Sequence, residues 1–341
     1  MKILFIPPSP FSFCYGGTEV QIEKTKEELE KLGHQVKIID FLDRSLLDWA
    51  DAIHLFGGWG PGTFLWLKMI LGRKPIIYST IFYWDKLWRK VALKIMSYVP
   101  ETRAWWYKKL IQQVDLVLPN SQAEAKQLQQ LFGVLKDKIQ IVPNGVEEDF
   151  KGDNPLAFRQ KYLADWPLDA SFILTVARLE KRKNILNLMK AADELGVYLV
   201  IIGAPNPNLK EKSYLEKIKA FSQGKKKIKF LGQIPRLELK NAYQSCSVFA
   251  LVSYFETPGL SSLEAGLNGA NLVLGKCQPV KEYFQNYAWL VNQGEESIKS
   301  GLKQALTEER NYYHQAEYIL KNYTWRKTAE LTSRAYQKVL E

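Results

Sequence analysis

The 341-residue sequence is poor in the residues that build several common kinds of protein. Its three cysteines, Cys14, Cys246 and Cys277, are too few and too scattered for a disulfide framework or a zinc site. No uncharged apolar run reaches the roughly 18–20 residues that a membrane-spanning helix needs. The longest candidate, residues 52–67, contains four glycines, a proline and a histidine, and therefore indicates a strand followed by a loop.

The rest of the composition indicates an ordered globular protein. Hydrophobic residues make up 46% of the chain, which excludes disorder as the main state. At about 150 residues per domain, the length suggests two domains. Because Met1 opens directly onto the apolar run 3–6, we expect no cleavable leader and a reducing, cytoplasmic compartment.

The positive charge is unevenly distributed. The chain has a formal net charge of +11, and two zones carry all of the excess. Residues 68–109 hold ten basic and two acidic residues, and residues 181–240 hold fourteen basic and five acidic residues. A surface charged only for solubility would mix both signs more evenly. The two zones therefore point to partners that carry negative charge.

Strands and helices are expected to alternate, which favours an α/β fold with parallel sheets covered by helices. Strands are expected at 2–6, 36–40, 52–56, 75–79, 116–119, 139–143, 172–176, 198–203, 228–231, 248–252, 271–274 and 289–291. Helices are expected at 18–32, 184–195, 211–222, 236–245, 259–268, 295–307, 308–321 and 326–340. Residues 147–168 are expected to form the linker region. Two doubly wound domains that face each other would bind ligands in a cleft at the carboxyl ends of their strands.

The strongest motif spans residues 255–265 and places two carboxylates, Glu256 and Glu264, eight residues apart. A Pro-Gly pair between them suits a helix start, which leaves the amides of Leu260 and Ser261 free to bind a phosphate. Glu264, in the second turn of that helix, would then reach ribose hydroxyls beyond the phosphate. The alternative is a pair of exposed helix charges, but the apolar, small flanking residues weaken it.

A second motif spans residues 175–184. It places Arg178 at the carboxyl end of a strand and Lys183 at the start of a helix, which suits a diphosphate. The alternative is a solvated charge cluster. Two weaker signals are Asn144, which lies where a strand runs into a turn, and the Gly16-Gly17 pair, which allows a ligand to approach the backbone closely.

With these motifs in this order, the sequence resembles the GT-B-fold glycosyltransferases of the large retaining group related to sucrose and glycogen synthases. Within that group it is similar to glycosyltransferase family 4. The resemblance covers essentially the whole chain. Its most specific elements are the Glu256-to-Glu264 motif and the Arg178 and Lys183 pair. It implies two Rossmann-like domains, 1–150 and 151–325, with the final helix 326–341 returning to the first domain.

The resemblance also implies a nucleotide-diphosphate sugar as co-substrate, no cofactor and no bound metal. Arg178 and Lys183 would bind the diphosphate and stabilise the leaving charge, while Glu256 would contact hydroxyls of the donor sugar. The catalytic residues would therefore be Arg178, Lys183 and Glu256. The other residues implied in donor binding are Gly16, Gly17, Asn144, Leu260, Ser261 and Glu264. The chain contains no Asp-x-Asp motif, so a metal-dependent GT-A enzyme gains no support.

The sequence departs from the family on the acceptor side. In many relatives the strand equivalent to residues 76–82 ends in a histidine that contacts the transferred sugar, and this chain has none there. His54, at the end of an earlier strand, is either an acceptor-side residue or a buried structural histidine. Asp85 is a second acceptor-side candidate for handling the proton.

The first basic zone also contains nine aromatic residues. Trp84, Trp88, Val91 and Ile95 follow helical spacing, and Lys86, Lys90 and Lys94 form a separate stripe. This pattern is typical of a helix that lies in the plane of an anionic membrane surface. The other membrane-contact candidates are Trp105 and Trp106. A core helix whose tryptophans pack inward is the main alternative, and a nucleic-acid groove lacks any accompanying motif.

These inferences combine into one hypothesis. The chain is expected to be a peripheral enzyme on the cytoplasmic face of the plasma membrane, transferring a sugar to a lipid-linked or surface-polysaccharide acceptor. Its partners would be the nucleotide sugar, the acceptor and an anionic membrane, with no nucleic acid. The alternative is a noncatalytic nucleotide-sugar or glycan-binding protein that kept the donor site, which the missing histidine suggests.

Overall fold

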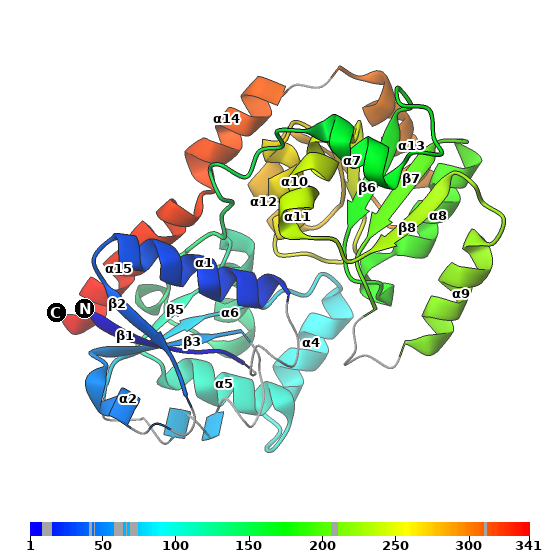
Figure 1. Ribbon diagram of the computed structural model, residues 1–341. Helices are drawn as coiled ribbons and strands as arrows, with labels where there is room; N and C mark the ends of the chain where they lie inside the picture. The colour runs from blue at the N-terminus through cyan, green and yellow to red at the C-terminus, as the bar shows by residue number, and fades with distance from the viewer. Residues whose placement is uncertain are drawn as a thin grey trace. The chain divides into compact units, whose positions relative to one another are not determined.

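The computed structural model describes residues 1–8, 16–40, 43, 45–57, 64–65, 67–68, 74–205, 211–309 and 312–341 (Figure 1). The chain forms two compact units. Unit 1 comprises Met1–Gly145 and Trp325–Glu341, and unit 2 comprises Val146–Thr324. The division therefore falls at Gly145 and not at residue 150, and the returning segment begins at Trp325.

Unit 1 contains a parallel sheet whose order is β2-β1-β3-β4-β5. Its strands are β1 (Lys2–Ile6), β2 (Gln35–Ile38), β3 (Ala52–Phe56), β4 (Ile76–Ser79) and β5 (Leu116–Leu118). Ile3, Leu4 and Phe5 of β1 are all fully buried, which is typical of a parallel strand covered on both faces.

The expected strand at 139–143 is wrong. Its residues run beside β5, but only an isolated bridge joins Ile139 to Val117. The amide of Val142 donates to the carbonyl of Pro119 over 3.0 Å. Pro119 has no N–H with which to return a hydrogen bond, so the ladder ends there.

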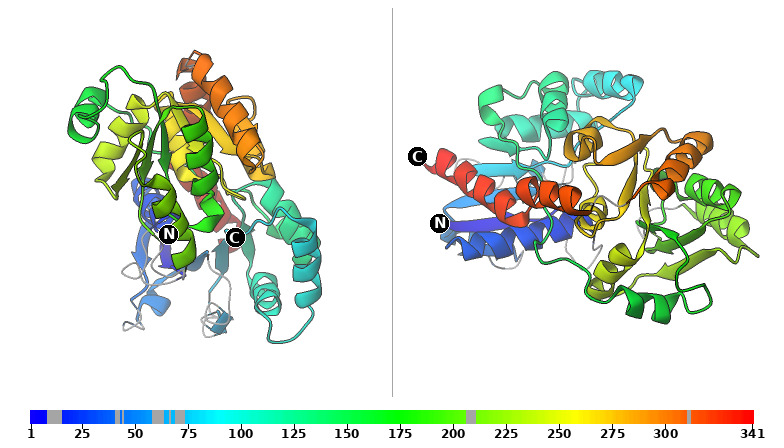
Figure 2. Two further views of the ribbon diagram at one scale, coloured as in Figure 1. Left: turned by 90° about the vertical axis from the view of Figure 1, so that its right-hand side faces the viewer. Right: turned by 90° about the horizontal axis from the view of Figure 1, so that it is seen from above.

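Helices cover both faces of the unit 1 sheet. They are α1 (Gly17–Lys31), α2 (Ser45–Trp49), α4 (Leu87–Met96), α5 (Arg103–Gln113), α6 (Gln122–Phe132) and α15 (Trp325–Leu340), with a 3-10 turn, η2 (Lys136–Lys138). The C-terminal helix α15 packs against α1, and both chain ends lie in this unit (Figure 2). Buried residues of α15 join the core cluster that contains Ile3 and Phe5.

Helices α5 and α6 were absent from the expected elements, although α6 carries clear local signals. The hydroxyl of Ser121 accepts from the amide of Glu124 at 3.1 Å, as in a capping box. The helix ends at Gly133, whose φ of 69° is the left-handed conformation that glycine adopts without cost. Leu128 of α6 is fully buried in the core cluster on the other face of the sheet.

Unit 2 contains a parallel sheet whose order is β11-β10-β9-β6-β7-β8. Its strands are β6 (Phe172–Val176), β7 (Tyr198–Ile202), β8 (Ile228–Gly232), β9 (Val248–Leu251), β10 (Asn271–Gly275) and β11 (Ala288–Val291). Its helices are α7 (Pro155–Tyr162), α8 (Ile185–Glu194), α9 (Lys212–Ser222), α10 (Arg236–Ser245), α11 (Leu260–Leu267), α12 (Gln278–Phe284), α13 (Glu295–Thr307) and α14 (Tyr312–Asn322), with a 3-10 turn, η3 (Lys181–Lys183).

Helix α7 lies inside the segment that was expected to be a linker, so that expectation is wrong. The side chain of Asn154 accepts from the amide of Ala157, and Pro155 occupies the first turn. Phe158 is buried and lies beside the ring of Phe172 in β6. The prolines and polar residues of this segment thus begin a helix that packs on the unit 2 core.

The order of the strands indicates where each sheet would bind a ligand. In unit 2 the chain runs from β6 through β7 to β8 on one side, then returns to β9 beside β6 and continues outward to β11. The direction therefore reverses between β6 and β9. In unit 1 it reverses between β1 and β3. Open α/β sheets bind ligands at the carboxyl ends of the strands at such a reversal.

Candidate donor site

The two strongest sequence motifs meet at the reversal point of unit 2. The turn η3 follows β6, and the loop that leads to α11 follows β9. Asn184 ties them together, since its side-chain amide donates to the carbonyl of Val252 at 3.3 Å and of Gln293 at 2.9 Å. Asn184 has a φ of 59°, a left-handed conformation that asparagine tolerates better than most residues. The carbonyl of Arg182 also accepts from the amide of Tyr254 at 2.9 Å.

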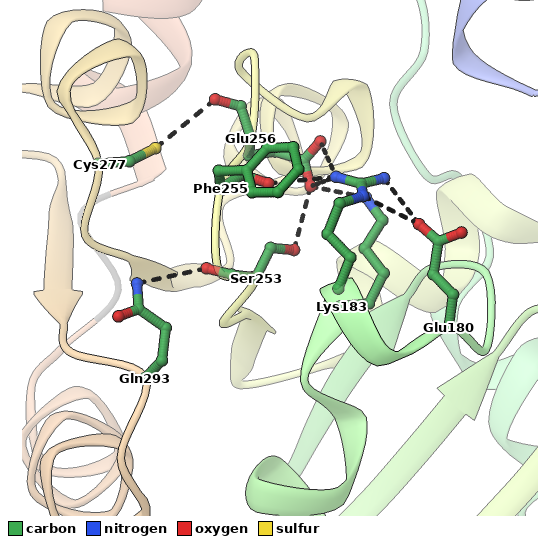
Figure 3. Close-up of polar contacts among 8 residues, drawn as sticks. Glu180, Lys183, Ser253, Phe255, Glu256, Cys277 and Gln293 are labelled. Carbon is green, nitrogen blue, oxygen red and sulfur yellow. Dashed lines mark hydrogen bonds and ion pairs between the residues drawn. The ribbon is translucent and has the colours of Figure 1, made fainter. Parts of the chain in front are cut away.

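At the centre of this site Lys183 and Glu256 form a buried ion pair (Figure 3). The Nζ of Lys183 lies 2.6 Å from the Oε2 of Glu256, and their side chains are 12% and 13% exposed. The hydroxyl of Ser253 donates to the same carboxylate oxygen at 3.0 Å. The structure therefore brings together two predicted catalytic residues that are 73 positions apart in sequence.

Arg182 is a second cation on the same carboxylate, and the sequence prediction did not include it. Its Nη1 lies 3.4 and 3.5 Å from the two oxygens of Glu256. Its Nη2 donates to the Oε1 of Glu180 at 2.7 Å, and Nη1 donates to the carbonyl of Phe255 at 3.1 Å. The sequence signal was a second basic residue beside Lys183, which alone does not distinguish an inward-facing side chain from a solvated one.

The electrostatics of this network give Glu256 a defined protonation state. Burial acts to raise the pKa of Glu256, but the charges of Lys183 and Arg182 outweigh it and hold the pKa at about 2. Burial lowers the pKa of Lys183 from its ordinary value, although Glu256 opposes this. Glu256 is thus ionised at neutral pH and acts as a hydrogen-bond acceptor, as it does for the hydroxyl of Ser253.

Helix α11 begins beside this pair. Gly259, just before Leu260 and Ser261, has a φ of 89°, and a Cβ there would lie 3.0 Å from the Cγ of Glu256 and 2.8 Å from Leu251. Only glycine fits this close approach without displacement. The arrangement puts the amino end of α11 next to the carboxylate, at the place where a helix favours an anion.

Glu264 lies in the second turn of α11 and is 7% exposed. Its Oε1 accepts from the Nη1 of Arg236 and its Oε2 accepts from the hydroxyl of Tyr243, each at 2.9 Å. Burial raises the pKa of Glu264, and Arg236 and Tyr243 counteract part of that increase. Arg236 also contacts Glu147, and its guanidinium lies 4.3 Å from the ring centroid of Phe150. Arg236 and Tyr243 are further residues that sequence reasoning missed.

The other predicted donor-site residues lie in both units. Arg178 lies in the loop after β6, is half-buried, and its carbonyl accepts from the amide of Glu180. Gly16 precedes α1 and Gly17 is its first residue, at the reversal point of the unit 1 sheet. Asn144 is buried in unit 1, next to the division at Gly145. Their roles in donor binding stay predictions.

The acceptor-side prediction for His54 is corrected by its environment. His54 is fully buried in the core of unit 1 and stacks on Phe56. Its Nδ1 lies 2.6 Å from the hydroxyl of Tyr336, and its Nε2 lies 2.8 Å from the hydroxyl of Ser79. With both ring nitrogens engaged, His54 is a structural residue that joins β3 to α15. Asp85, by contrast, is exposed just before α4.

The burial of His54 predicts a dependence of stability on pH. Burial lowers the pKa of His54 to about 3, so the folded protein keeps the ring neutral where the unfolded chain, with a pKa near 6.5, takes up a proton. The stabilisation is therefore complete above pH 6.5 and is lost as the pH falls. The free energy of unfolding should drop by about 2 kcal/mol between pH 7 and pH 5 from this group.

Chemical denaturation at both pH values tests this expectation. His54→Gln should remove most of that 2 kcal/mol difference, while His314→Gln, on an exposed histidine, should leave it unchanged. An equal pH dependence in His54→Gln and the wild type would contradict the account.

The predicted membrane-contact residues divide into two groups. Trp88, Val91 and Ile95 lie on α4 and are 63%, 50% and 62% exposed. Trp84 precedes the helix, packs against the unit 1 core and exchanges two hydrogen bonds between its backbone and the side chain of Gln127. The expectation that Trp84 shares the exposed stripe is wrong, because α4 begins only at Leu87.

The remaining membrane-contact candidates differ in how exposed their side chains are. Trp105 and Trp106 of α5 are half-buried and pack against each other, with Trp106 also packing on Phe64. Lys86 and Lys94 are exposed, and Lys90 is half-buried with its Nζ 5.8 Å from the ring centroid of Tyr83. Helix α4 therefore carries an exposed apolar face with lysines beside it.

None of the described helices is long and apolar enough to cross a membrane. The described part of the chain also contains no group of three His, Cys, Asp or Glu side chains that could hold a metal ion. Cys246 and Cys277 are both buried.

Two family models match this chain. The model for glycosyl transferases group 1 matches residues 159–322, and the model for glycosyltransferase family 4 matches residues 40–150. The first match contains η3, the loop after β9 and α11. The second contains His54, Asp85 and α4. Together the two matches leave only the ends of the chain and a short segment near the division uncovered.

Curated relatives are similar over most of this chain. A D-inositol 3-phosphate glycosyltransferase of Corynebacterium urealyticum is 24% identical over 70% of this chain and 60% of its own length. The serotype-specific mannosyltransferase WbdA of Escherichia coli is 25% identical over 71% of this chain and 31% of its own length. The chain thus spans at most three fifths of the length of these relatives.

Solved structures share the fold over nearly the whole chain. Sucrose-phosphate synthase from Thermosynechococcus elongatus superposes with a TM-score of 0.76 at 17% identity, covering 99% of this chain and 98% of that one. HepE of Anabaena, solved in complex with UDP and glucose, gives a TM-score of 0.76 at 16% identity and covers 99% of both chains. The chain thus matches glycosyltransferase family models over residues 40–150 and 159–322 and shares the GT-B fold of these solved structures.

Proposed function

We propose that the chain transfers a sugar, with retention of its anomeric configuration, from a nucleotide-diphosphate sugar to a lipid-linked or surface-polysaccharide acceptor. The observation that carries this proposal is the part-buried network of Lys183, Arg182 and Glu256 beside the amino end of α11. It supplies positive charge for a departing diphosphate and an ionised carboxylate for sugar hydroxyls. The named relatives support the class, since HepE binds UDP and glucose, and WbdA is a mannosyltransferase.

In this proposal the donor lies at the reversal point of unit 2. Arg178, Lys183 and the amides of Leu260 and Ser261 bind the diphosphate and stabilise the charge that develops as it leaves. Glu264 accepts hydrogen bonds from the ribose. These groups use charge and backbone donors and require no metal, and Asp85 serves as the acceptor-side candidate.

The experiment that tests this function uses purified full-length chain with a panel of nucleotide-diphosphate sugars, beginning with UDP-glucose and GDP-mannose. We expect one donor to raise the melting temperature and to yield a glycosylated product when a bacterial membrane extract is added. NMR of the product would report its anomeric configuration. A donor that binds but yields no product in any combination would favour the noncatalytic binding protein.

We further propose that α4 binds the anionic inner surface of the plasma membrane. The exposed face of Trp88, Val91 and Ile95 is apolar, and Lys86 and Lys94 flank it. The apolar side chains would enter the interface while the lysines meet lipid phosphates, each lysine contributing about 1 kcal/mol. The charge complementarity of lysines and anionic headgroups is what favours a membrane as the occupant of this face.

Sedimentation with vesicles that contain phosphatidylglycerol tests the proposed membrane contact. The double variant Trp88→Ala with Ile95→Ala should weaken vesicle binding by about tenfold or more. Burying the apolar surface of these two side chains in the membrane contributes about 2–4 kcal/mol to the binding free energy. Binding should also weaken as salt is raised, since exposed charges are screened.

A matched control is Leu237→Ala, which removes an apolar side chain that is 73% exposed on α10 of unit 2. It should leave sedimentation unchanged. Trp84→Ala should lower the melting temperature instead, because Trp84 packs on the unit 1 core. Undiminished sedimentation of the Trp88 and Ile95 double variant would contradict the membrane role of α4.

A further inference from the structure

The ion network of the donor site contains one more cation than the resemblance assigns. Glu180 and Glu256 carry two negative charges, and Arg182 and Lys183 carry two positive charges, so the four side chains balance in the described structure. A diphosphate that binds Lys183 adds at least two negative charges to this balance. It draws the ammonium charge away from Glu256, which is 13% exposed and cannot replace that charge with water.

Lys183 and Arg182 differ in how firmly they are held. Among the described residues, the Nζ of Lys183 reaches only Glu256. The guanidinium of Arg182 is anchored without help from Glu256, through two hydrogen bonds to Glu180 of 2.7 and 3.1 Å and one to the carbonyl of Phe255 of 3.1 Å. Glu180 itself is buried, with a side chain 6% exposed. Arg182 therefore stays in place when the ammonium is shared with a ligand.

We propose that Arg182 is a positioning residue that holds the Glu256 carboxylate ionised and in place while the donor diphosphate engages Lys183. This inference rests on the proposed donor site. The Nη1 of Arg182 lies 3.4 and 3.5 Å from the two oxygens of Glu256, and the hydroxyl of Ser253 donates to one of them. The Sγ of Cys277 lies 3.5 Å from the backbone carbonyl oxygen of Glu256. Arg182 thus keeps a positive charge beside a carboxylate that, in the proposed donor site, accepts hydrogen bonds from the donor sugar.

The proposal makes the roles of Arg182 and Glu256 interdependent. Without Arg182, a diphosphate on Lys183 would leave a buried carboxylate without a counter-charge, and Glu256 would take up a proton. Without the charge of Glu256, Arg182 would have nothing to compensate. A residue that only stabilised the loop would show neither the proton uptake nor the interdependence.

Calorimetry of the full chain with UDP and GDP tests the proposal, using whichever the wild-type protein binds. Arg182→Met should weaken binding at least tenfold and bind about one proton with the ligand, seen as an enthalpy that depends on the buffer. Arg182→Lys should restore part of the affinity. Glu256→Gln removes the carboxylate charge that Arg182 compensates, so adding Arg182→Met to it should cause no further loss of affinity.

The outcomes separate the proposals. Arg182→Met could weaken nucleotide binding as much in the Glu256→Gln background as in the wild-type background, or weaken it without proton uptake. Either result would make Arg182 a loop-stabilising residue and overturn the inference. If the wild-type protein binds neither UDP nor GDP, the proposed donor site itself fails. Nucleotide binding by the double variant, Arg182→Met with Glu256→Gln, would also show that the Arg182→Met change does not prevent folding.

Discussion

Lys183→Ala should lower kcat/KM for the donor sugar by about a thousandfold. Removing one neutral donor from an oxyanion site typically costs about 10²–10³ in rate, and Lys183 carries a full charge in a buried position. The change also removes the cation 2.6 Å from Glu256, so the pKa of Glu256 should rise. Steady-state kinetics with the donor identified by melting temperature would measure the loss.

The matched control for Lys183→Ala is Lys181→Ala. Lys181 belongs to the same 3-10 turn, but its side chain is exposed. It should change kcat/KM by less than twofold. Activity near that of the wild type in Lys183→Ala would remove the basis for the donor site.

Glu264→Ala should reduce both stability and donor affinity. The substitution deletes the acceptor of two buried hydrogen bonds and leaves Tyr243, itself fully buried, without a partner for its hydroxyl. Leaving buried polar groups unsatisfied costs about 2–3 kcal/mol. Loss of the proposed ribose contact should weaken nucleotide binding by about a hundredfold, because charged hydrogen bonds contribute about 1.5–3 kcal/mol each.

Two further variants separate the stability and binding effects. Glu264→Gln keeps the side-chain shape and an oxygen for Tyr243, so it should recover most of the stability but little of the affinity. Glu238→Gln is the control, since Glu238 likewise contacts a basic residue, Lys161, and a tyrosine, Tyr162, but at the surface. Such a surface pair is worth less than about 1 kcal/mol. Wild-type nucleotide affinity in Glu264→Ala would rule out the ribose role.

Local patterns predicted much of the secondary structure. The strand expected at 2–6 and that expected at 172–176 appear with those bounds, because buried parallel strands are short runs of apolar residues. The strand expected at 139–143 failed for a non-local reason. Its partner position is Pro119, and the missing amide of that proline matters only when the two segments lie side by side.

Several residues of the candidate site could be predicted from the sequence, but the contacts between their side chains could not. Glu256, Glu264 and Lys183 stand out through spacing and through the resemblance to a known family. Arg182, Arg236 and Tyr243 do not, because an arginine or tyrosine on a loop or helix has the same local pattern whether it faces a carboxylate or water. The same ambiguity applies to His54, which only the hydroxyls of Ser79 and Tyr336 identify as structural.

The sequence by itself determined the class of this protein: two α/β units, a donor-type motif pair and a basic aromatic zone. These features depend on hydrophobic periodicity and residue spacing, which act along the chain. Only the tertiary structure decided which charges pair and which side chains are buried. Glu256 meets Lys183 and Arg182 because β6 and β9 are neighbours in the sheet, and Trp88 is exposed while Trp84 is not because α4 begins between them. Burial and pairing depend on elements distant in sequence, and they set the protonation and accessibility on which the chemistry rests.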